Sequence, residues 1–128
     1  MKNSPPTLSG RIRSVGYALN GIRILIISQH NAWIHLLAAI IVVLAGFYFH
    51  LARAEWLWII LAIIWVWAAE ALNTALELLT DLISPDIHPL AGKVKDVAAG
   101  AVLITAIGSV LVGLLIFGPH VFALAQSR

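Results

Sequence analysis

Three of the chain's six acidic residues lie in one stretch, Glu70-Ala-Leu-Asn-Thr-Ala-Leu-Glu-Leu-Leu-Thr-Asp81, directly after fourteen uncharged residues at 56–69. No glycine or proline interrupts 56–84, and Pro85 follows, so the pattern predicts one long helix that ends before this proline. At 3.6 residues per turn the three carboxylates fall within roughly 40° of one another, with Asn73 beside them. Carboxylates close to hydrocarbon are costly, so this acidic stripe (Glu70, Glu77 and Asp81) marks a candidate functional site.

The composition is that of an integral membrane protein. The chain has 128 residues, of which 61% are hydrophobic and 11% are charged, whereas about a quarter of the residues in a soluble domain are charged. This length allows one domain with about three membrane spans. The absence of cysteine excludes disulfides, cysteine nucleophiles and cysteine metal sites.

The expected fold class is an all-α membrane protein with an amphipathic N-terminal surface helix and three transmembrane helices. The alternative for the first helix is that it extends the first span. The single membrane domain is expected at 10–118, between a disordered lead-in at 1–9 and a tail at 119–128. The surface helix is expected at about 10–28 and the spans at about 32–51, 56–83 and 96–117, with turns at 28–31 and 53–55, a loop at 84–92, and Gly118-Pro119 ending the last helix.

Basic residues set the expected orientation, because loops rich in lysine and arginine stay in the cytoplasm. One side carries Lys2, Arg11, Arg13, Arg23, Lys93 and Lys95, and the other carries Arg53 and Arg128. The N-terminus and the connection at 81–96 are therefore expected in the cytoplasm. The acidic stripe then lies at the cytoplasmic boundary, where a soluble nucleotide and a membrane lipid can meet.

Two acids seven residues apart with an amide between them suit a divalent cation and a proton acceptor. Magnesium takes hard oxygen ligands and usually only one or two protein carboxylates, with phosphates supplying others. Glu77 is nearer the aqueous end and is the better metal ligand. Glu70 lies about two turns deeper, which suits a general base, and Asn73 would orient the base or a substrate hydroxyl.

Several of the neighbouring polar residues have ordinary structural explanations. Asp96 is expected in the first turn of the last helix, where it serves either a site or the helix dipole. Lys95 meets phosphate or only signals topology, and Asp81 takes part in the site or is simply a solvated acid. The histidines have no metal-ligand spacing, and His35 is expected to hydrogen-bond within the bundle.

Two classes of function fit these residues: an enzyme acting on a lipid headgroup, and a proton or cation translocator with an acidic relay. A relay requires polar groups spaced through the membrane, whereas these acids gather at one boundary, which favours the enzyme. No GxxxxGK[ST], GxGxxG or GxSxG motif is present, so a nucleotide would not be bound by a common soluble fold.

The stretch from Glu70 to Asp81 resembles the signature E-x-[LIVM]-N-[ST]-[SA]-[LIV]-E-x3-D of the prokaryotic diacylglycerol kinase family. The likeness covers about residues 10–117. Further matches are Gly16-Tyr17, Gly21-Ile22-Arg23, His88-Pro-Leu-Ala and Lys95-Asp96-Val-Ala-Ala-Gly-Ala-Val-Leu103.

This resemblance implies a three-span kinase of the bacterial inner membrane with a cytoplasmic N-terminus. The family forms homotrimers with active sites shared between protomers, and transfers the γ-phosphate of MgATP to the hydroxyl of diacylglycerol or undecaprenol. It implies catalytic roles for Glu70, Asn73 and Asp96, substrate contacts for Arg23 and Glu70, Mg²⁺ ligation by Glu77 and Gln29, and ATP or metal contacts for Arg11 (or Arg13 in another register), Tyr17, Gln29, Glu77, Asp86, His88, Lys95 and Asp96.

Gln29 is a departure from the family, whose members commonly have a glutamate there as a second metal ligand. The neutral amide binds through oxygen without adding charge, so we expect weaker metal binding or one metal fewer. The prolines of the 84–92 loop and the Ala-Ala-Gly that follows are more similar to the undecaprenol kinase branch than to the glycerolipid branch.

Overall fold

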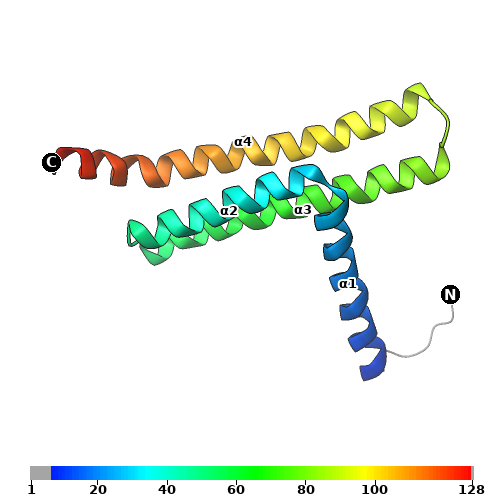
Figure 1. Ribbon diagram of the computed structural model, residues 1–128, viewed down its shortest axis with the longest axis horizontal. Coiled ribbons are helices and arrows are strands. Elements are labelled where there is room, and N and C mark those ends of the chain that lie inside the picture. The colour runs from blue at the N-terminus through cyan, green and yellow to red at the C-terminus, as the bar shows by residue number, and fades with distance from the viewer. Residues whose placement is uncertain (1–6, 128) are drawn as a thin grey trace.

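The computed structural model describes residues 7–127, which form four helices and no strand. These are α1 (Leu8–Ser28), α2 (His30–Tyr48), α3 (Arg53–Ile83) and α4 (Pro89–Gln126). Helices α2, α3 and α4 run side by side, while α1 turns away from them (Figure 1). Each of the three long helices is apolar and long enough to cross a membrane. The predicted fold class is therefore confirmed.

Helix α1 is separate from the first span. Gln29 has an extended backbone (φ −110°, ψ 117°) and is the only residue between α1 and α2, so the alternative of one continuous helix is wrong and the turn at 28–31 is shorter than expected. Thr7 caps α1, with Oγ1 accepting a hydrogen bond from the Gly10 N–H at 3.2 Å. The helix therefore begins before residue 10. Most of the predicted 1–9 lead-in, residues 1–6, lies outside the described residues.

The corner between α2 and α3 occupies residues 49–52, because α2 ends at Tyr48 rather than at 51. His50 has a positive φ of 53°, and the Leu51 N–H donates to the Gly46 carbonyl at 3.1 Å, a common way to end a helix. The expected turn at 53–55 is instead the first turn of α3. There the Glu55 carboxylate accepts a hydrogen bond from the Ala52 N–H at 2.8 Å.

Helix α4 begins at Pro89, earlier than the helix start at 93 that follows from a loop at 84–92. Proline suits the first helical position, since its φ is fixed and no N–H is left unpaired there. His88 caps the helix, with Nδ1 accepting a hydrogen bond from the Leu90 N–H at 3.2 Å. The loop is therefore shorter than 84–92, and Asp96 lies almost two turns inside α4. The helix-dipole explanation of Asp96 is wrong.

Helix α4 also continues through Pro119 to Gln126, so the predicted end at Gly118-Pro119 is wrong and most of the predicted tail is helical. Proline costs one backbone hydrogen bond. Unwinding in an apolar environment would leave several backbone groups unpaired, so a helix continuing past proline is favoured there. In addition, His120 Nε2 lies 2.9 Å from Glu55 Oε1 and connects this extension to α3.

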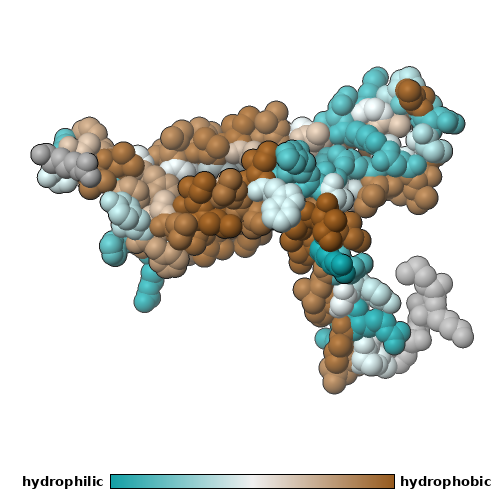
Figure 2. Space-filling model, in the orientation of Figure 1, coloured by the Kyte–Doolittle hydropathy of each residue, from teal (hydrophilic) through white to brown (hydrophobic). Residues whose placement is uncertain are grey.

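The surface is mostly apolar along the three long helices, and hydrophilic side chains gather near the end where α3 turns into α4 (Figure 2). Few apolar side chains are buried within the chain: Leu25, Ala32, Leu51, Ile59, Val66, Ala98 and Val102. The largest fully buried side chain is a carboxylate, that of Glu70. A single chain thus turns its apolar residues outward and an acid inward.

Candidate active site

Buried polar side chains gather on one face of α3. Glu70 is 1% exposed, and Asn73 and Thr74 are also buried. Thr74 is satisfied locally, since its hydroxyl donates to the Glu70 carbonyl at 2.9 Å. Glu70 Oε1 and Asn73 Oδ1, by contrast, are buried without a hydrogen-bond partner in the described chain. Buried oxygens without a hydrogen bond are uncommon and call for an explanation, such as a catalytic role or contact with water or an ion.

Glu77 lies one turn beyond Asn73 and is held by two amides. The Asn73 side chain donates to Oε1 at 2.9 Å, and the Gln29 side chain donates to Oε2 at 2.9 Å. Gln29 comes from the α1–α2 junction, so the polar turn before the first span reaches the end of the second. The structure therefore brings Gln29, Asn73 and Glu77 together, as the sequence had suggested for two of them from helix spacing.

His35 on α2 approaches Glu70. Its Nε2 atom lies 3.0 Å from Glu70 Oε1, and the side chain is 19% exposed. The distance is that of an ion pair, but the N–H direction is not aligned for a hydrogen bond, so Oε1 remains without one. Sequence analysis placed His35 within the bundle but not in the site. The available signal was a lone titratable residue near the start of an apolar span.

Lys95 on α4 forms an ion pair with Asp81 on α3. Both side chains are exposed, so the pair contributes little to stability and can be exchanged at low cost. The contact brings a cation from α4 to the aqueous end of the acidic stripe. Asp81 is therefore both exposed to solvent and ion-paired, and Lys95 is ion-paired close to the candidate site.

The remaining predicted site residues do not join this cluster within residues 7–127. Each is exposed and forms no side-chain hydrogen bond or ion pair with the cluster: Arg11, Arg13, Tyr17, Arg23, Asp86 and Asp96. His88 caps α4 instead. Arg11 and Tyr17 lie on α1, which points away from the bundle (Figure 1). One chain therefore brings the acids and amides together, whereas the residues expected to contact the nucleotide lie apart from them.

The donors around Glu77 fit a magnesium ion that arrives with phosphate. In the described part of the chain no three acidic, histidine or cysteine side chains converge as a complete cage. Magnesium commonly takes one or two carboxylates and completes its shell with phosphate and water. Glu77 supplies a half-buried carboxylate and Asn73 an unpartnered oxygen. The Gln29 amide presents its oxygen after a half-turn of the side-chain amide.

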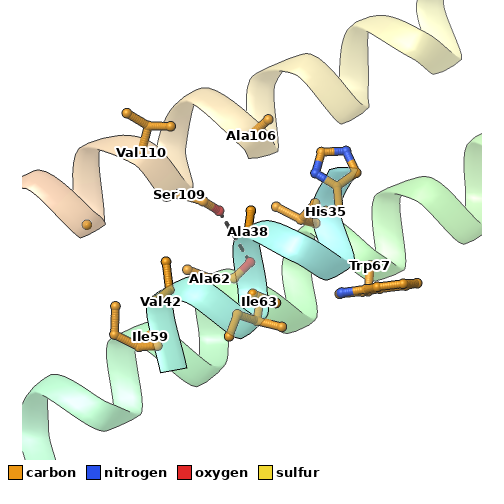
Figure 3. Close-up of a pocket in the computed structure, with 13 residues that line it drawn as sticks. His35, Ala38, Val42, Ile59, Ala62, Ile63, Trp67, Ala106, Ser109 and Val110 are labelled. Carbon is orange, nitrogen blue, oxygen red and sulfur yellow. Dashed lines mark hydrogen bonds between the residues drawn. The ribbon is translucent and has the colours of Figure 1, made fainter. Parts of the chain in front are cut away.

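A largely apolar cavity of about 330 Å³ lies between α2, α3 and α4, with His35 and Trp67 near one end (Figure 3). Ser109 is one of its few polar side chains, and its hydroxyl donates to the Ala62 carbonyl at 3.3 Å. The wall is formed by His35, Ala38, Ala39, Val42, Ile59, Ala62, Ile63, Val66, Trp67, Ala106, Ser109, Val110 and Gly113. The cavity therefore reaches the buried acid through His35.

Comparison with known proteins finds relatives over most of the chain. Residues 16–117 match the family described as prokaryotic diacylglycerol kinase. The chain is 45% identical over 92 residues to an undecaprenol kinase of Bacillus subtilis (strain 168), covering 72% of this chain and 75% of the relative. It is 35% identical over 124 residues to a diacylglycerol kinase of Synechocystis sp., covering 96% and 71%.

A diacylglycerol kinase of Escherichia coli (strain K12) is 26% identical over 120 residues, covering 94% of this chain and 98% of the relative. The matched region 16–117 includes all of α2 and α3, and with them the buried Glu70 and the half-buried Glu77. These matches, with three apolar helices around a buried carboxylate, identify the chain as a membrane lipid kinase that belongs to the prokaryotic diacylglycerol kinase family.

Proposed function

We propose that this chain transfers the γ-phosphate of MgATP to the hydroxyl of a membrane lipid, with Glu70 as general base and Glu77 and Gln29 at the metal. One observation carries the proposal: a fully buried carboxylate with an unpartnered oxygen lies two turns from a second carboxylate held between amides. The first carboxylate suits proton abstraction in an apolar environment, and the second suits a cation at the boundary of that environment.

Glu70 acts on the acceptor. It removes the proton of the lipid hydroxyl while the lipid oxygen bonds to the γ-phosphorus and the bond from that phosphorus to the bridging oxygen breaks, releasing ADP. Phosphoryl transfer depends chiefly on alignment and charge neutralisation. Asn73 lies between the two acids, and its free Oδ1 aligns the acceptor or the phosphate-bound cation.

The phosphates are bound at the aqueous end. Glu77, Gln29 and Asn73 provide oxygen ligands there, and Lys95 leaves Asp81 to meet the phosphate oxygens. A bound Mg²⁺ neutralises phosphate charge and orients the transferred group. Arg11 or Arg13, Tyr17, Asp86, His88 and Asp96 complete the nucleotide site, and Arg23 joins Glu70 at the lipid.

Helix length supports a site at the membrane boundary. About 20 residues span the hydrocarbon, so a span that starts at Trp56 ends near residue 75. Glu70 then lies inside the boundary and Glu77 lies at it. Lysines and arginines gather at the same end, which favours the cytoplasmic side. We therefore propose that this end and the N-terminus face the cytoplasm, in the bacterial inner membrane.

Undecaprenol is our proposed acceptor. The 45% identical relative carries the name undecaprenol kinase, whereas the relatives named diacylglycerol kinase share 35% and 26%. The apolar cavity beside His35 provides room for part of a lipid chain. Diacylglycerol is the competing substrate.

Reconstituted protein is tested with labelled ATP and either undecaprenol or diacylglycerol. We expect phosphorylated undecaprenol, no ATP consumption without a lipid alcohol, and no proton current. Glu70→Gln should lower turnover about 10²- to 10⁴-fold, the range for a lost general base, while nucleotide binding survives. Glu55→Gln, at the opposite end of α3, is the matched control. Near-normal turnover in Glu70→Gln would remove this residue from the mechanism, and a lipid-independent proton current would support the translocator.

A further inference from the structure

We propose that His35 is a positioning residue for Glu70 in lipid phosphorylation: its imidazole fixes the buried carboxylate so that the base faces the acceptor hydroxyl. This inference rests on the proposed role of Glu70 as the base. His35 belongs to a different helix from the acidic stripe, so helix spacing alone does not associate the two residues.

The contact is specific within the described chain. His35 Nε2 and Glu70 Oε1 are 3.0 Å apart, and the carboxylate is 1% exposed. The other two ion pairs of residues 7–127 involve Lys95 with Asp81 and His120 with Glu55. His35 is therefore the one basic side chain in the described part that lies within ion-pair distance of Glu70.

Burial makes this neighbour important. Taking a carboxylate out of water is costly unless a charged or hydrogen-bonding group accompanies it. Thr74 donates to the Glu70 backbone carbonyl and not to the carboxylate. The imidazole, 3.0 Å from Oε1, thus provides the local compensation.

His35 and Gln29 together fix both acids of the site. Gln29 contacts Glu77, and His35 contacts Glu70. Gln29 and His35 are six residues apart and Glu70 and Glu77 are seven apart, so the two contacts follow one another along the antiparallel α2 and α3. These two contacts hold the base and the metal ligand at a set spacing. Displacement of a catalytic group by about 1 Å can cost about 100-fold in rate, so loss of either contact should affect turnover.

His35 also faces the place from which the lipid would approach. Its side chain lines the apolar cavity between α2, α3 and α4, close to Trp67 (Figure 3). The remaining wall carries no charged side chain. A purely structural histidine in the bundle interior would not need to contact both the buried acid and this cavity.

The test compares His35→Ala and His35→Gln with wild-type protein in the reconstituted kinase assay, with melting temperature measured on each. We expect His35→Ala to lower kcat about 10- to 100-fold and to change the KM for ATP less than about twofold, since only the reacting geometry is lost. Glutamine keeps an N–H near the Nε2 position, so His35→Gln should recover a clear part of kcat, including where the alanine variant fails to fold.

His120→Gln is the matched control, because it alters the other histidine–glutamate contact, 2.9 Å long, at the opposite end of the bundle. It should keep wild-type kcat. Wild-type kcat in His35→Ala, a loss confined to KM, or a well-folded His35→Gln no better than His35→Ala would overturn the proposal. Glu70→Gln separates the two levels: an active Glu70→Gln contradicts the proposed function itself, whereas an inactive Glu70→Gln with a fully active His35→Ala contradicts only the role of His35.

Discussion

The same residue type has three different environments along α3. Glu55 caps the helix and contacts His120, Glu70 is buried beside His35, and Glu77 lies half-buried between two amides. The first carboxylate serves as a helix cap. A carboxylate in an apolar environment with a single neighbour suits a general base, and one at the membrane boundary suits a cation ligand. We therefore base the different roles proposed for Glu70 and Glu77 on their depth along α3.

Gln29→Glu tests the metal site directly. The change replaces a donor 2.9 Å from Glu77 Oε2 by a second carboxylate. Two like charges at that distance repel each other unless a cation lies between them. We expect a lower melting temperature than wild type in EDTA, a larger rise on adding Mg²⁺, and half-maximal kinase activity at lower Mg²⁺.

Gln29→Ala is the control for that change, because it removes the hydrogen bond without adding charge. It should lower the melting temperature and gain nothing from Mg²⁺. A large loss of activity in Gln29→Glu at every Mg²⁺ concentration would show that the amide has another role, such as holding Glu77 through its N–H.

At the scale of the helices, apolar runs and the acidic stripe were sufficient to predict four helices and their order. Their ends were missed where local capping decided the boundary. The sequence pattern places Pro89 in a loop, whereas proline is common at the first helical position. It places a helix end at Pro119, whereas a membrane favours continued helix. Arg53 begins α3 because Glu55 accepts the Ala52 N–H.

The site residues on a single helix could be predicted from the sequence, and the contacts between helices could not. Glu70, Asn73 and Glu77 lie on one helix, so their spacing alone associated them. The contacts of Gln29 with Glu77, Lys95 with Asp81 and His35 with Glu70 join different helices. Such contacts depend on how the helices pack, which periodicity does not specify.

Gly46→Ala tests the packing of the α2–α3 corner. A Cβ at Gly46 would lie 2.7 Å from the Trp56 ring and 3.2 Å from Leu51 Cδ1. The Trp56 ring also packs against Phe47, with centroids 5.0 Å apart, so it has little freedom to move aside. We expect a loss of about 1–3 kcal/mol, the usual cost of overpacking, seen as a lower melting temperature.

Gly108→Ala, on α4, is the control, since within residues 7–127 no atom beyond its chain neighbours and its own helix backbone lies within 4 Å of its Cβ position. Alanine has the higher helix propensity, so this variant should be unchanged or slightly more stable. Equal melting temperatures for Gly46→Ala and wild type would show that the corner yields to the extra methyl group.

At the scale of the whole molecule, one chain does not bring all of the proposed site residues together. Most of its large apolar side chains face outward. Lys95 and Asp96 lie on α4, and Asp96 is exposed. His35 and the buried Glu70 lie against each other between α2 and α3 instead. A second copy packed on the long helices would bring another set of polar residues to the acids of the first, and we propose a homotrimer with shared sites for this reason and from the family resemblance.

Mixing two inactive variants distinguishes shared sites from sites within one chain. Glu70→Gln removes the base and Lys95→Ala removes the phosphate contact, so each alone should be inactive. If the base of one protomer works with the lysine of its neighbour, random reassembly of equal amounts should restore about a quarter of the wild-type rate, because each site then needs one particular ordered pair of neighbours. The measurement is kinase activity against mixing ratio after co-reconstitution from denatured protomers, with wild type mixed with each variant as the control. Activity no higher than that of the separate variants would mean that the base and the lysine act within one chain. The exposed Asp96 would then have to contact the substrate within its own chain as well.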